Sequence, residues 1–466
     1  MVKSTTQQSA GKRVLIAGKG LAGRTLAEDV QADGDVVVGF LDDHAQDGDV
    51  LGSLDEVASV CRSQHIDVVY FAIPSAPAEV VREFVARVPR PEVELAIIPR
   101  TYRVVSRDRV SVSDLTDVDV LDFVGRAPVK HDMEKAREQL RGKRVLVTGA
   151  AGSIGSRVLA QLAALEPELI IGLDRAESAV FHLGRSLADQ SNVVLEIGDV
   201  QSEPRIKQVL QQYQPEYVFH VAAYKHVPLM QANPVEAFNN NVWGTLNVMR
   251  SAAEHGVSHA VYVSTDKAVN PTNVMGATKR LGELLLRDLG SMYPNTRFSG
   301  VRFGNVLESE GSVMQIFRRQ LAAGHNLTVT HPDINRFFMT IDEAAQLIIQ
   351  SASLGSHGDL FVLDMGEPIR VVDLAQGLIN AVNPSLGIDV VGLRPGEKMY
   401  EELSYEASEI DQTSHPKIMI MKEREEISAG VTLNWAEALL RRTRECEISN
   451  EDLVSEMRAF GFNAIQ

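Results

Sequence analysis

An acid and a base stand side by side in the stretch Ser264-Thr265-Asp266-Lys267, directly after an apolar segment at 260–263. A carboxyl group next to an amine can supply both halves of a proton transfer if the two side chains face one substrate. The alternative is a turn at the end of a strand with an ion pair at the surface. A second stretch, Met275 to Lys279, opens a helical pattern shortly afterwards.

A glycine-rich loop, Gly149 to Gly155, follows an apolar segment and opens another helical pattern. Gly149 lets the chain turn sharply, and Gly152 leaves backbone N–H groups open to a pyrophosphate. Gly155 permits close packing of the helix on the strand. In this context the GxxGxxG spacing predicts a dinucleotide site rather than a plain tight turn.

Acidic residues at the ends of the next two predicted strands extend this site. Asp174 can bond the adenosine ribose hydroxyl and repel a 2′-phosphate, which favours NAD. Arg175 beside it could accept that phosphate, so NADP remains open. Asp199 suits the adenine amino group, although a cap at the strand end is an equal interpretation.

An earlier loop, Gly18 to Gly23, matches GxGxxG after a strand, and Asp42 and Asp43 end the following strand. A nucleotide site and a packing turn are both open here. The packing turn is favoured slightly, because no chemically active residues accompany the loop.

Apolar segments alternate with helical patterns along most of the chain, and Lys12–Gly18 is echoed by Lys143–Gly149. This rhythm predicts an α/β fold with two Rossmann-like domains, each a doubly wound parallel sheet covered by helices. A helix is predicted at 77–88. The predicted strands are 13–17, 36–41, 67–73, 93–98, 144–148, 169–173, 193–197, 217–221, 260–264 and 297–302.

The length of 466 residues exceeds one ordinary core. A polar stretch with the connector Asp122–Pro128 places a boundary near residue 135. Residues 1–135 are predicted to form a nucleotide-binding-like domain and connector, and 136–466 the catalytic domain. In the latter, the NAD(P) part covers about 141–300. The alternation weakens after about 305, so 301–466 should hold shorter elements that cover the open end of the sheet and bind substrate.

The net charge of −16 disfavours a nucleic-acid surface. The two cysteines, Cys61 and Cys446, form no disulfide or metal-ligand pattern, so we expect no metal site and a reducing cytoplasm. No stretch reaches the roughly 18 apolar residues of a membrane span. The polar residues 1–10 are typical of a disordered leader.

Five segments of the second half resemble, in order, the extended short-chain dehydrogenase/reductases. More narrowly, they resemble the UDP-N-acetylglucosamine 4,6-dehydratases of polysaccharide biosynthesis. The segments are Val147–Ser156, Ala222–Pro228, Ser264–Ala268, Val301–Val306 and Leu393–Lys398. The N-terminal domain resembles the extra domain of the longer, usually membrane-anchored members. Their anchoring helices are missing here, so the resemblance implies a soluble variant or a shortened chain.

The resemblance implies a 4,6-dehydratase that converts UDP-N-acetylglucosamine into a 4-keto-6-deoxy sugar. Oxidation at C4 by a tightly bound, recycled NAD, or NADP, acidifies C5–H; water leaves from C6, and the hydride returns there. Lys267 would remove the C5 proton, Asp266 would protonate the leaving hydroxyl, and Thr265 would bond near O4. Lys279 would bind the nicotinamide ribose and lower nearby pKa values.

The implied site residues fall into three sets. The catalytic set is Thr265, Asp266, Lys267, Met275 and Lys279. The cofactor set is Gly149, Gly152, Ser153, Ile154, Gly155, Asp174, Arg175, Asp199, Val200, Ala222, Ala223 and Lys279. The substrate set is Lys225, His226, Asn305, Arg336, Arg394 and Glu397, in which arginine forks suit phosphate oxygens. For the arginines, an ordinary surface position is the alternative.

Two departures bear on the activity. Met275 stands where most short-chain dehydrogenases carry tyrosine, but the longer dehydratases also have methionine there. The group that takes the C4 hydroxyl proton stays open between Asp266 and a water held by Thr265. Glu308 and Glu310 replace a glycine and a basic residue of the family pattern, which leaves the exact sugar open.

Two other functions remain as alternatives. An NAD-dependent sugar-nucleotide epimerase would oxidise C4 without eliminating water, and would not need the Asp266-Lys267 pair. A non-catalytic dinucleotide-sensing protein would need neither that pair nor Lys279. Enzymes of this kind usually associate through helices flanking the site, so we expect a homo-oligomer.

Overall fold

The computed structural model describes residues 11–45, 47–98, 116–117, 133–354, 358–404, 410–422 and 430–466, and the chain divides into two compact units. The first unit combines the N-terminal 130 residues with 317–332 and 369–391. The second combines 131–316, 333–368 and 392–466. The two short segments of the first unit lie in the region that the sequence assigned to the catalytic domain. The connector Asp122–Pro128 falls outside the described residues.

The first unit contains a six-stranded sheet in the order β3-β2-β1-β4-β5-β6. Its strands are parallel except for β6. Leu26 and Val30 of α1 pack with Val14 and Ile16 of β1 in the core. The strands are β1 (Arg13–Ala17), β2 (Val36–Leu41), β3 (Val50–Gly52), β4 (Val68–Phe71), β5 (Glu94–Ile97) and β6 (Thr116–Asp117). The helices are α1 (Leu21–Ala32), α2 (Val57–Gln64) and α3 (Ala78–Arg87).

The later segments of this unit add a helix against α3 and a small parallel sheet. The helix is α15 (Val371–Val382), and the paired strands are β14 (Leu327–Val329) and β19 (Ile388–Val390). The apolar face of α15 buries Leu374 and Leu378.

The second unit contains a nine-stranded sheet in the order β20-β21-β17-β12-β11-β10-β7-β8-β9. The strands from β9 to β17 are parallel, and β21 and β20 pair antiparallel at one edge. The strands are β7 (Arg144–Thr148), β8 (Leu169–Asp174), β9 (Val193–Ile197), β10 (Tyr217–His220), β11 (His259–Val263), β12 (Arg297–Arg302), β17 (Leu360–Leu363), β20 (Ile410–Gln412) and β21 (Ile418–Met421).

Helices cover both faces of this sheet, because successive strand residues alternate between two apolar cores. Val145 and Val147 point into the core with α5, α6 and α14, whereas Leu146 joins α8, α11 and α12 on the other face. The helices are α5 (Glu134–Leu140), α6 (Ser153–Ala163), α7 (Glu177–Ser186), α8 (Glu203–Tyr213), α11 (Gly244–Glu254), α12 (Val274–Met292) and α14 (Ile341–Ser351). The predicted doubly wound fold is therefore confirmed.

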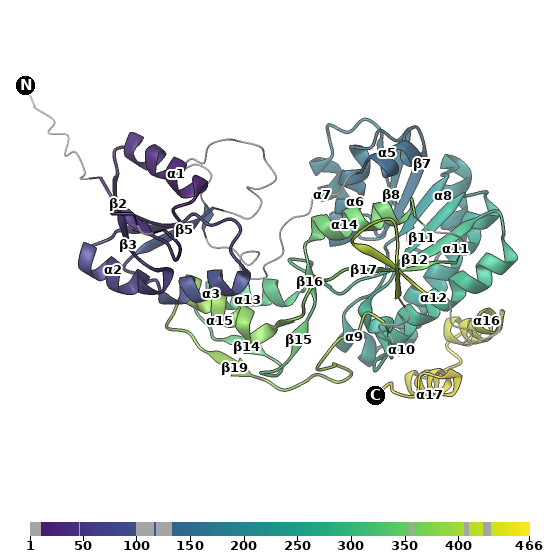
Figure 1. Cartoon of the computed structure of the whole chain (residues 1–466). Helices are drawn as coiled ribbons and strands as arrows, with labels where there is room; N and C mark the ends of the chain where they lie inside the picture. Colours follow the sequence, from purple (N-terminus) through teal and green to yellow (C-terminus); the bar gives the residue numbers. More distant parts are fainter. Residues whose placement is uncertain are drawn as a thin grey trace, which may run out of the picture. The chain divides into compact units, whose positions relative to one another are not determined.

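Two C-terminal helices pack outside this layer (Figure 1). Helix α16 (Val431–Arg444) contacts α12, and α17 (Asn450–Phe460) contacts α10 (Pro234–Phe238). Trp435 of α16 stacks on Phe460 and meets the edge of Phe238. The neighbouring helical turns are α9 (Val227–Ala232), the π-helical turn Asn239–Trp243 and the 3-10 turn Asp266–Ala268.

The strand–helix alternation, predicted to weaken after about residue 305, continues for one more repeat. After β12, the chain forms α14 and then β17, which pairs parallel with β12 and extends the sheet. An inserted region hides this repeat, because β13 (Asn305–Val306), α13 (Val313–Ala322), β15 (Asn335–Arg336) and β16 (Phe338–Met339) separate β12 from α14. Strand β3 was also not predicted, since it is short and only partly buried.

Two global findings concern the described residues only. None of their helices is both long and apolar enough to cross a membrane. Their His, Cys, Asp and Glu side chains form no group that could hold a metal ion.

A buried ion pair joins β12 to α12. Glu283 Oε1 accepts from Arg302 Nε at 2.7 Å, and Oε2 accepts from Arg302 Nη2 at 2.6 Å. The Arg302 side chain is fully buried, and that of Glu283 nearly so. Burial would raise the pKa of Glu283, but Arg302 outweighs this and lowers it. The pair thus stays charged inside the protein.

We predict that Arg302→Met lowers the free energy of unfolding by roughly 3 kcal/mol, because it removes the two-bond partner of the buried Glu283 charge and leaves Arg280 and Ser264 to bond it. The midpoint of urea unfolding, followed by circular dichroism, measures this. Glu456→Gln is the control, since the Arg442–Glu456 pair is exposed and should contribute less than about 1 kcal/mol. Equal losses in the two variants would contradict the prediction.

Candidate active site

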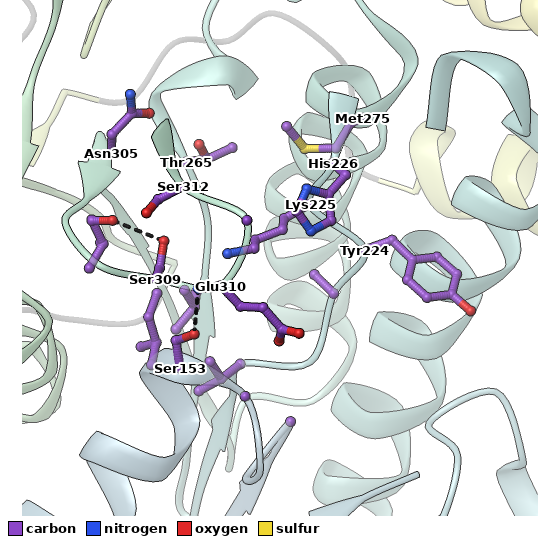
Figure 2. Close-up of a pocket in the computed structure, with 18 of the residues that line it drawn as sticks. Ser153, Tyr224, Lys225, His226, Thr265, Met275, Asn305, Ser309, Glu310 and Ser312 are labelled. Carbon is purple, nitrogen blue, oxygen red and sulfur yellow. Dashed lines mark hydrogen bonds between the residues drawn. The ribbon is translucent and has the colours of Figure 1, made fainter. Parts of the chain in front are cut away.

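A cavity of about 670 Å³ opens in the second unit and is lined by residues that follow β7, β8, β10, β11 and β12. Ligands of doubly wound folds bind outside the carboxyl ends of the parallel strands, where the strand order reverses. Here it reverses at β7, which lies between β8 and β10. Figure 2 shows side chains from several of these segments around the cavity.

The glycine loop after β7 has the geometry that a dinucleotide phosphate requires. Gly149 has φ +68°, and a Cβ there would lie 2.6 Å from the Ala222 backbone nitrogen. A Cβ on Gly155 would lie 2.0 Å from the Gly149 carbonyl oxygen, so this glycine packs helix against turn. A Cβ on Gly152 would meet only that oxygen, at 3.3 Å. Gly152 therefore leaves the cavity open beside the start of α6, whose N-terminus favours an anion.

Asp174 ties this loop to the end of β8. Its Oδ2 accepts from Ala151 N and its Oδ1 from Ala176 N, both at 3.0 Å. Each carboxylate oxygen has a second lone pair, so Asp174 can still accept from a ribose hydroxyl. Its carboxyl group lies at the cavity wall.

Arg175 also lines the cavity, but its guanidinium is already engaged. It stacks 4.5 Å over the Tyr224 ring and lies 3.5 Å from Asp199 Oδ2. Asp199 lies outside the cavity lining and also accepts from Gln201 N. Arg175 and Asp199, which were both predicted at the adenosine end, thus pair with each other.

Lys279 and Met275 project from one face of α12 into the cavity. The Lys279 ammonium lies 4.0 Å from the centre of the buried Tyr262 ring. Burial lowers the pKa of Lys279 to about 7, although Glu283 opposes the shift. Met275 is only 3% exposed and has no titratable group, so this position contributes shape but no proton.

The acid–base stretch after β11 forms a closely bonded cluster. Lys267 Nζ donates to Asp266 Oδ1 and to Asn305 Oδ1, both at 3.0 Å. Thr265 Oγ1 donates to the same Asp266 oxygen at 2.8 Å. Lys267 and Thr265 line the cavity, whereas Asp266 is fully buried behind them. Its deep position comes from the 3-10 turn that Thr265 caps.

Arg336 connects this cluster to the motif near residue 396. Arg336 Nη2 donates to Glu397 Oε1 at 3.2 Å, and Arg336 Nε lies 3.9 Å from Glu401 Oε1. Glu401 Oε1 is in turn 3.8 Å from Lys267 Nζ. Sequence reasoning missed Glu401. The only available signal was its position just beyond the Leu393–Lys398 segment, and this does not distinguish it from Glu402.

Lys225 and His226 line the cavity near the segment that carries Glu310 (Figure 2). Ser153 Oγ accepts from Glu310 N at 3.0 Å, so this segment contacts the glycine-rich loop directly. Gly311 has φ +69°, and a Cβ there would lie 2.4 Å from the His226 ring. Desolvation lowers the pKa of Lys225, and the Glu310 carboxylate opposes this shift.

Most of the predicted site residues meet at the cavity. The lining includes all of them except Asp199 and the buried Asp266. Arg394 lines it as an exposed residue, and its backbone N–H donates to Glu397 Oε2. Of the two departures from the family pattern, Glu310 lines the cavity and Glu308 lies outside the lining.

The glycine loop of the first unit has a similar connection. Asp42 Oδ2 accepts from Lys19 N at 2.7 Å, as Asp174 accepts from Ala151 N in the second unit. The Lys19 side chain is only 8% exposed and pairs with Asp47 and Asp49. These two ion pairs neutralise the Lys19 charge within the unit. Whether the loop binds a nucleotide or only turns the chain stays a prediction.

The fold and the cavity define an extended short-chain dehydrogenase/reductase of the sugar-nucleotide dehydratase and epimerase type. Residues 145–423 match the family described as polysaccharide biosynthesis protein, and the chain belongs to that family. Residues 3–99 match a family described as CoA-binding domain.

Curated relatives agree with this membership. The chain is 42% identical to the capsular polysaccharide biosynthesis protein CapD of Staphylococcus aureus, over 76% of this chain and 60% of that protein. It is 38% identical to the probable polysaccharide biosynthesis protein EpsC of Bacillus subtilis, over 89% of this chain and 72% of that one. The chain thus spans less than two thirds of the first relative.

Two further relatives differ in activity but match equally well. One is the inverting UDP-N-acetylglucosamine 4,6-dehydratase of Campylobacter jejuni, at 33% identity. The other is a UDP-glucose 4-epimerase of Rickettsia bellii, at 35%. Each match covers 56% of this chain and 77% of the relative.

Solved structures show the same fold. Pen from Bacillus thuringiensis has a TM-score of 0.58 and 32% identity, over 65% of this chain and 98% of Pen. DesIV, a dTDP-glucose 4,6-dehydratase from Streptomyces venezuelae solved with NAD, has a TM-score of 0.52 and 21% identity, over 68% of this chain and 98% of DesIV.

We predict that Gly152→Ala weakens NAD binding at least about tenfold while changing stability by less than about 1 kcal/mol, because the added methyl meets the ligand and little else. Gly155→Ala should lose both stability and binding, since its Cβ would collide with the Gly149 carbonyl. Calorimetric titration with NAD and thermal melting separate the two effects. Unchanged NAD affinity in Gly152→Ala would show that the cofactor lies elsewhere.

Proposed function

We propose that the protein is an NAD-dependent 4,6-dehydratase of a UDP-sugar, most simply UDP-N-acetylglucosamine, which it converts into the UDP-4-keto-6-deoxy sugar. The observation that carries this proposal is the cluster around Lys267. A dehydration needs an acid and a base on neighbouring carbons, whereas a C4 epimerisation needs neither at C5 or C6. Lys267 and Asp266 supply these two groups 3.0 Å apart beside the cavity.

The glycine loop, Asp174 and Lys279 fit a bound dinucleotide. The loop would present the start of α6 to the pyrophosphate, and Asp174 would accept from a ribose hydroxyl, which favours NAD over NADP. A bound NAD would supply the hydride transfer that oxidation at C4 and reduction at C6 require. Lys279 would hold the nicotinamide ribose, and its charge would stabilise negative charge that develops nearby.

The residues of the cluster have separate tasks in this proposal. Lys267, as a neutral amine, takes the C5 proton after C4 has been oxidised. Asp266, as a protonated carboxyl, gives a proton to the C6 hydroxyl, which leaves as water. Thr265 bonds near O4. The C4 hydroxyl proton passes to Asp266 or to a water at Thr265, because Met275 cannot accept it.

Other groups on the cavity wall suit a nucleoside diphosphate. Arg394, Lys225 and His226 offer donors to phosphate oxygens, and Asn305 offers an amide to the sugar. Arg336 is held by Glu397 and backbone carbonyls, so it would contribute charge more than direct bonds.

A sugar-nucleotide 4-epimerase is the second candidate, favoured by the identity to the Rickettsia enzyme. One experiment separates the two. The purified protein is incubated with UDP-N-acetylglucosamine, and the product mass is followed without added cofactor. Loss of one water supports the dehydratase. An isomer of unchanged mass would support the epimerase and refute our proposal. No reaction would direct the search to other UDP-, dTDP- and GDP-sugars.

We predict that Lys267→Ala reduces dehydration at least about 1000-fold without weakening NAD binding, because the general base is lost while the glycine loop is intact. Product formation and NAD titration of the same sample measure the two effects. Wild-type turnover in this variant would exclude Lys267 as the base.

We predict that Glu310→Gln lowers the KM for the UDP-sugar roughly threefold to tenfold at low salt, because it removes a negative charge from the wall of an anion-binding cavity. Glu308→Gln, the matched control, makes the same charge change outside the cavity lining and should have little effect. Equal KM changes in both variants would indicate a general charge effect rather than a contact at the site.

A further inference from the structure

The Lys267 ammonium lies between two buried carboxyl groups. Its Nζ is 3.0 Å from Asp266 Oδ1 on one side and 3.8 Å from Glu401 Oε1 on the other. The Asp266 side chain is fully buried, and that of Glu401 is 4% exposed. Both carboxyl groups therefore act on Lys267 through protein rather than through water, where charges interact more strongly.

One oxygen of each carboxyl group has no hydrogen-bond partner among the described residues. These atoms are Asp266 Oδ2 and Glu401 Oε2, and both are buried. A buried carboxylate oxygen without a donor is costly, so such an atom in a native protein indicates a proton, a ligand or a catalytic task. Glu401 also lines the cavity.

Two further cationic side chains lie near Glu401. Arg336 Nε is 3.9 Å from Glu401 Oε1. Lys398 Nζ donates to Glu402 Oε2 and to the Val269 carbonyl oxygen. Arg336 is held by Glu397 and by backbone carbonyls, so it is anchored without Glu401. Lys267 has no such neutral anchor apart from Asn305. Loss of Glu401 should thus affect Lys267 more than Arg336.

We propose that Glu401 is a positioning residue that sets the pH at which Lys267 becomes a neutral amine, by placing a second carboxylate against the Lys267 ammonium. The coupling is a property of the protein without substrate. Only its effect on turnover rests on the proposed function, in which Lys267 must be neutral to take a proton from C5.

The pKa shifts of Lys267 and Glu401 have the directions that this geometry predicts. Burial alone would lower the pKa of Lys267, but Asp266 and Glu401 outweigh it and raise the pKa. Burial raises the pKa of Glu401, and Lys267 opposes that shift. If the Glu401 charge is removed, a raising contribution is lost, and the pKa of Lys267 falls. The free amine then exists at lower pH.

The test is the ionisation of Lys267 itself, measured without substrate. Lysines are labelled with acetic anhydride over a range of pH, and the extent at Lys267 is read by peptide mass spectrometry against an added small amine. We expect Glu401→Gln to lower the pKa of Lys267 by about one unit or more. Labelling at a pH below this pKa would then rise about tenfold.

Glu402→Gln is the matched control, because it makes the same change in the next residue, whose carboxyl group is 46% exposed and pairs with Lys398. Its Lys267 profile should match the wild type. Glu401→Asp keeps the charge but withdraws it by one methylene, so it should give a smaller shift in the same direction. This variant replaces Glu401→Gln if the latter does not fold. A Lys267 profile that is unchanged in the Glu401 variant, or shifted equally by Glu402→Gln, overturns the proposal.

The pH dependence of turnover then distinguishes this inference from the proposed function. If Lys267 is the C5 base, the acid limb of kcat/KM should move to lower pH in Glu401→Gln, in step with labelling. A shift in labelling without a shift in turnover would support the role of Glu401 and refute that of Lys267 as the base.

Discussion

The buried pair of Arg302 and Glu283 is the constraint on which the catalytic geometry depends. Glu283 lies one turn after Lys279 on α12, and Arg302 ends β12, directly before the turn that leads to Asn305. The same carboxylate accepts from Ser264 Oγ at 2.6 Å, and Ser264 immediately precedes the acid–base stretch. Three segments that carry Lys279, Lys267 and Asn305 are therefore fixed at one carboxylate. The attraction between two buried charges offsets their desolvation only in good geometry. The pair therefore fixes the positions of these three segments relative to one another.

In both units, an aspartate at the end of the strand after the glycine loop accepts a hydrogen bond from a backbone N–H of that loop. The side chains around the two loops differ. In the second unit Asp174 holds the loop, while the glycines leave the cavity open beside α6. In the first unit Asp42 makes the equivalent bond, and the nearly buried Lys19 side chain pairs with Asp47 and Asp49. The shared pattern thus specifies the same loop-to-strand hydrogen bond in both units.

In the proposed reaction, Met275 cannot carry a proton, so the proton transfers would fall to the groups around Lys267. This cluster joins two carboxyl groups, Asp266 and Glu401, to two cationic side chains, Lys267 and Arg336. All four side chains are largely buried. Lys279 lies apart from this cluster, and burial brings its pKa to about 7. The two lysines of the site therefore differ in pKa because acidic neighbours at short range outweigh burial at Lys267, whereas burial dominates at Lys279.

The sequence by itself determined the doubly wound fold and most strand positions, and it named site residues of which all but Asp199 and Asp266 line the cavity. These follow from local rules: apolar segments of strand length, glycines at fixed spacing, and polar residues placed where strands end. The tertiary structure decided the rest. The extension of the sheet by β17 and the grouping of 317–332 and 369–391 with the first unit depend on contacts between distant segments. Glu401 joined the site because the chain returns to Lys267 more than 100 residues later. Glu401 and Glu402 are the same residue type in adjacent positions, and only burial distinguishes the carboxyl group that acts on Lys267 from the one in solvent.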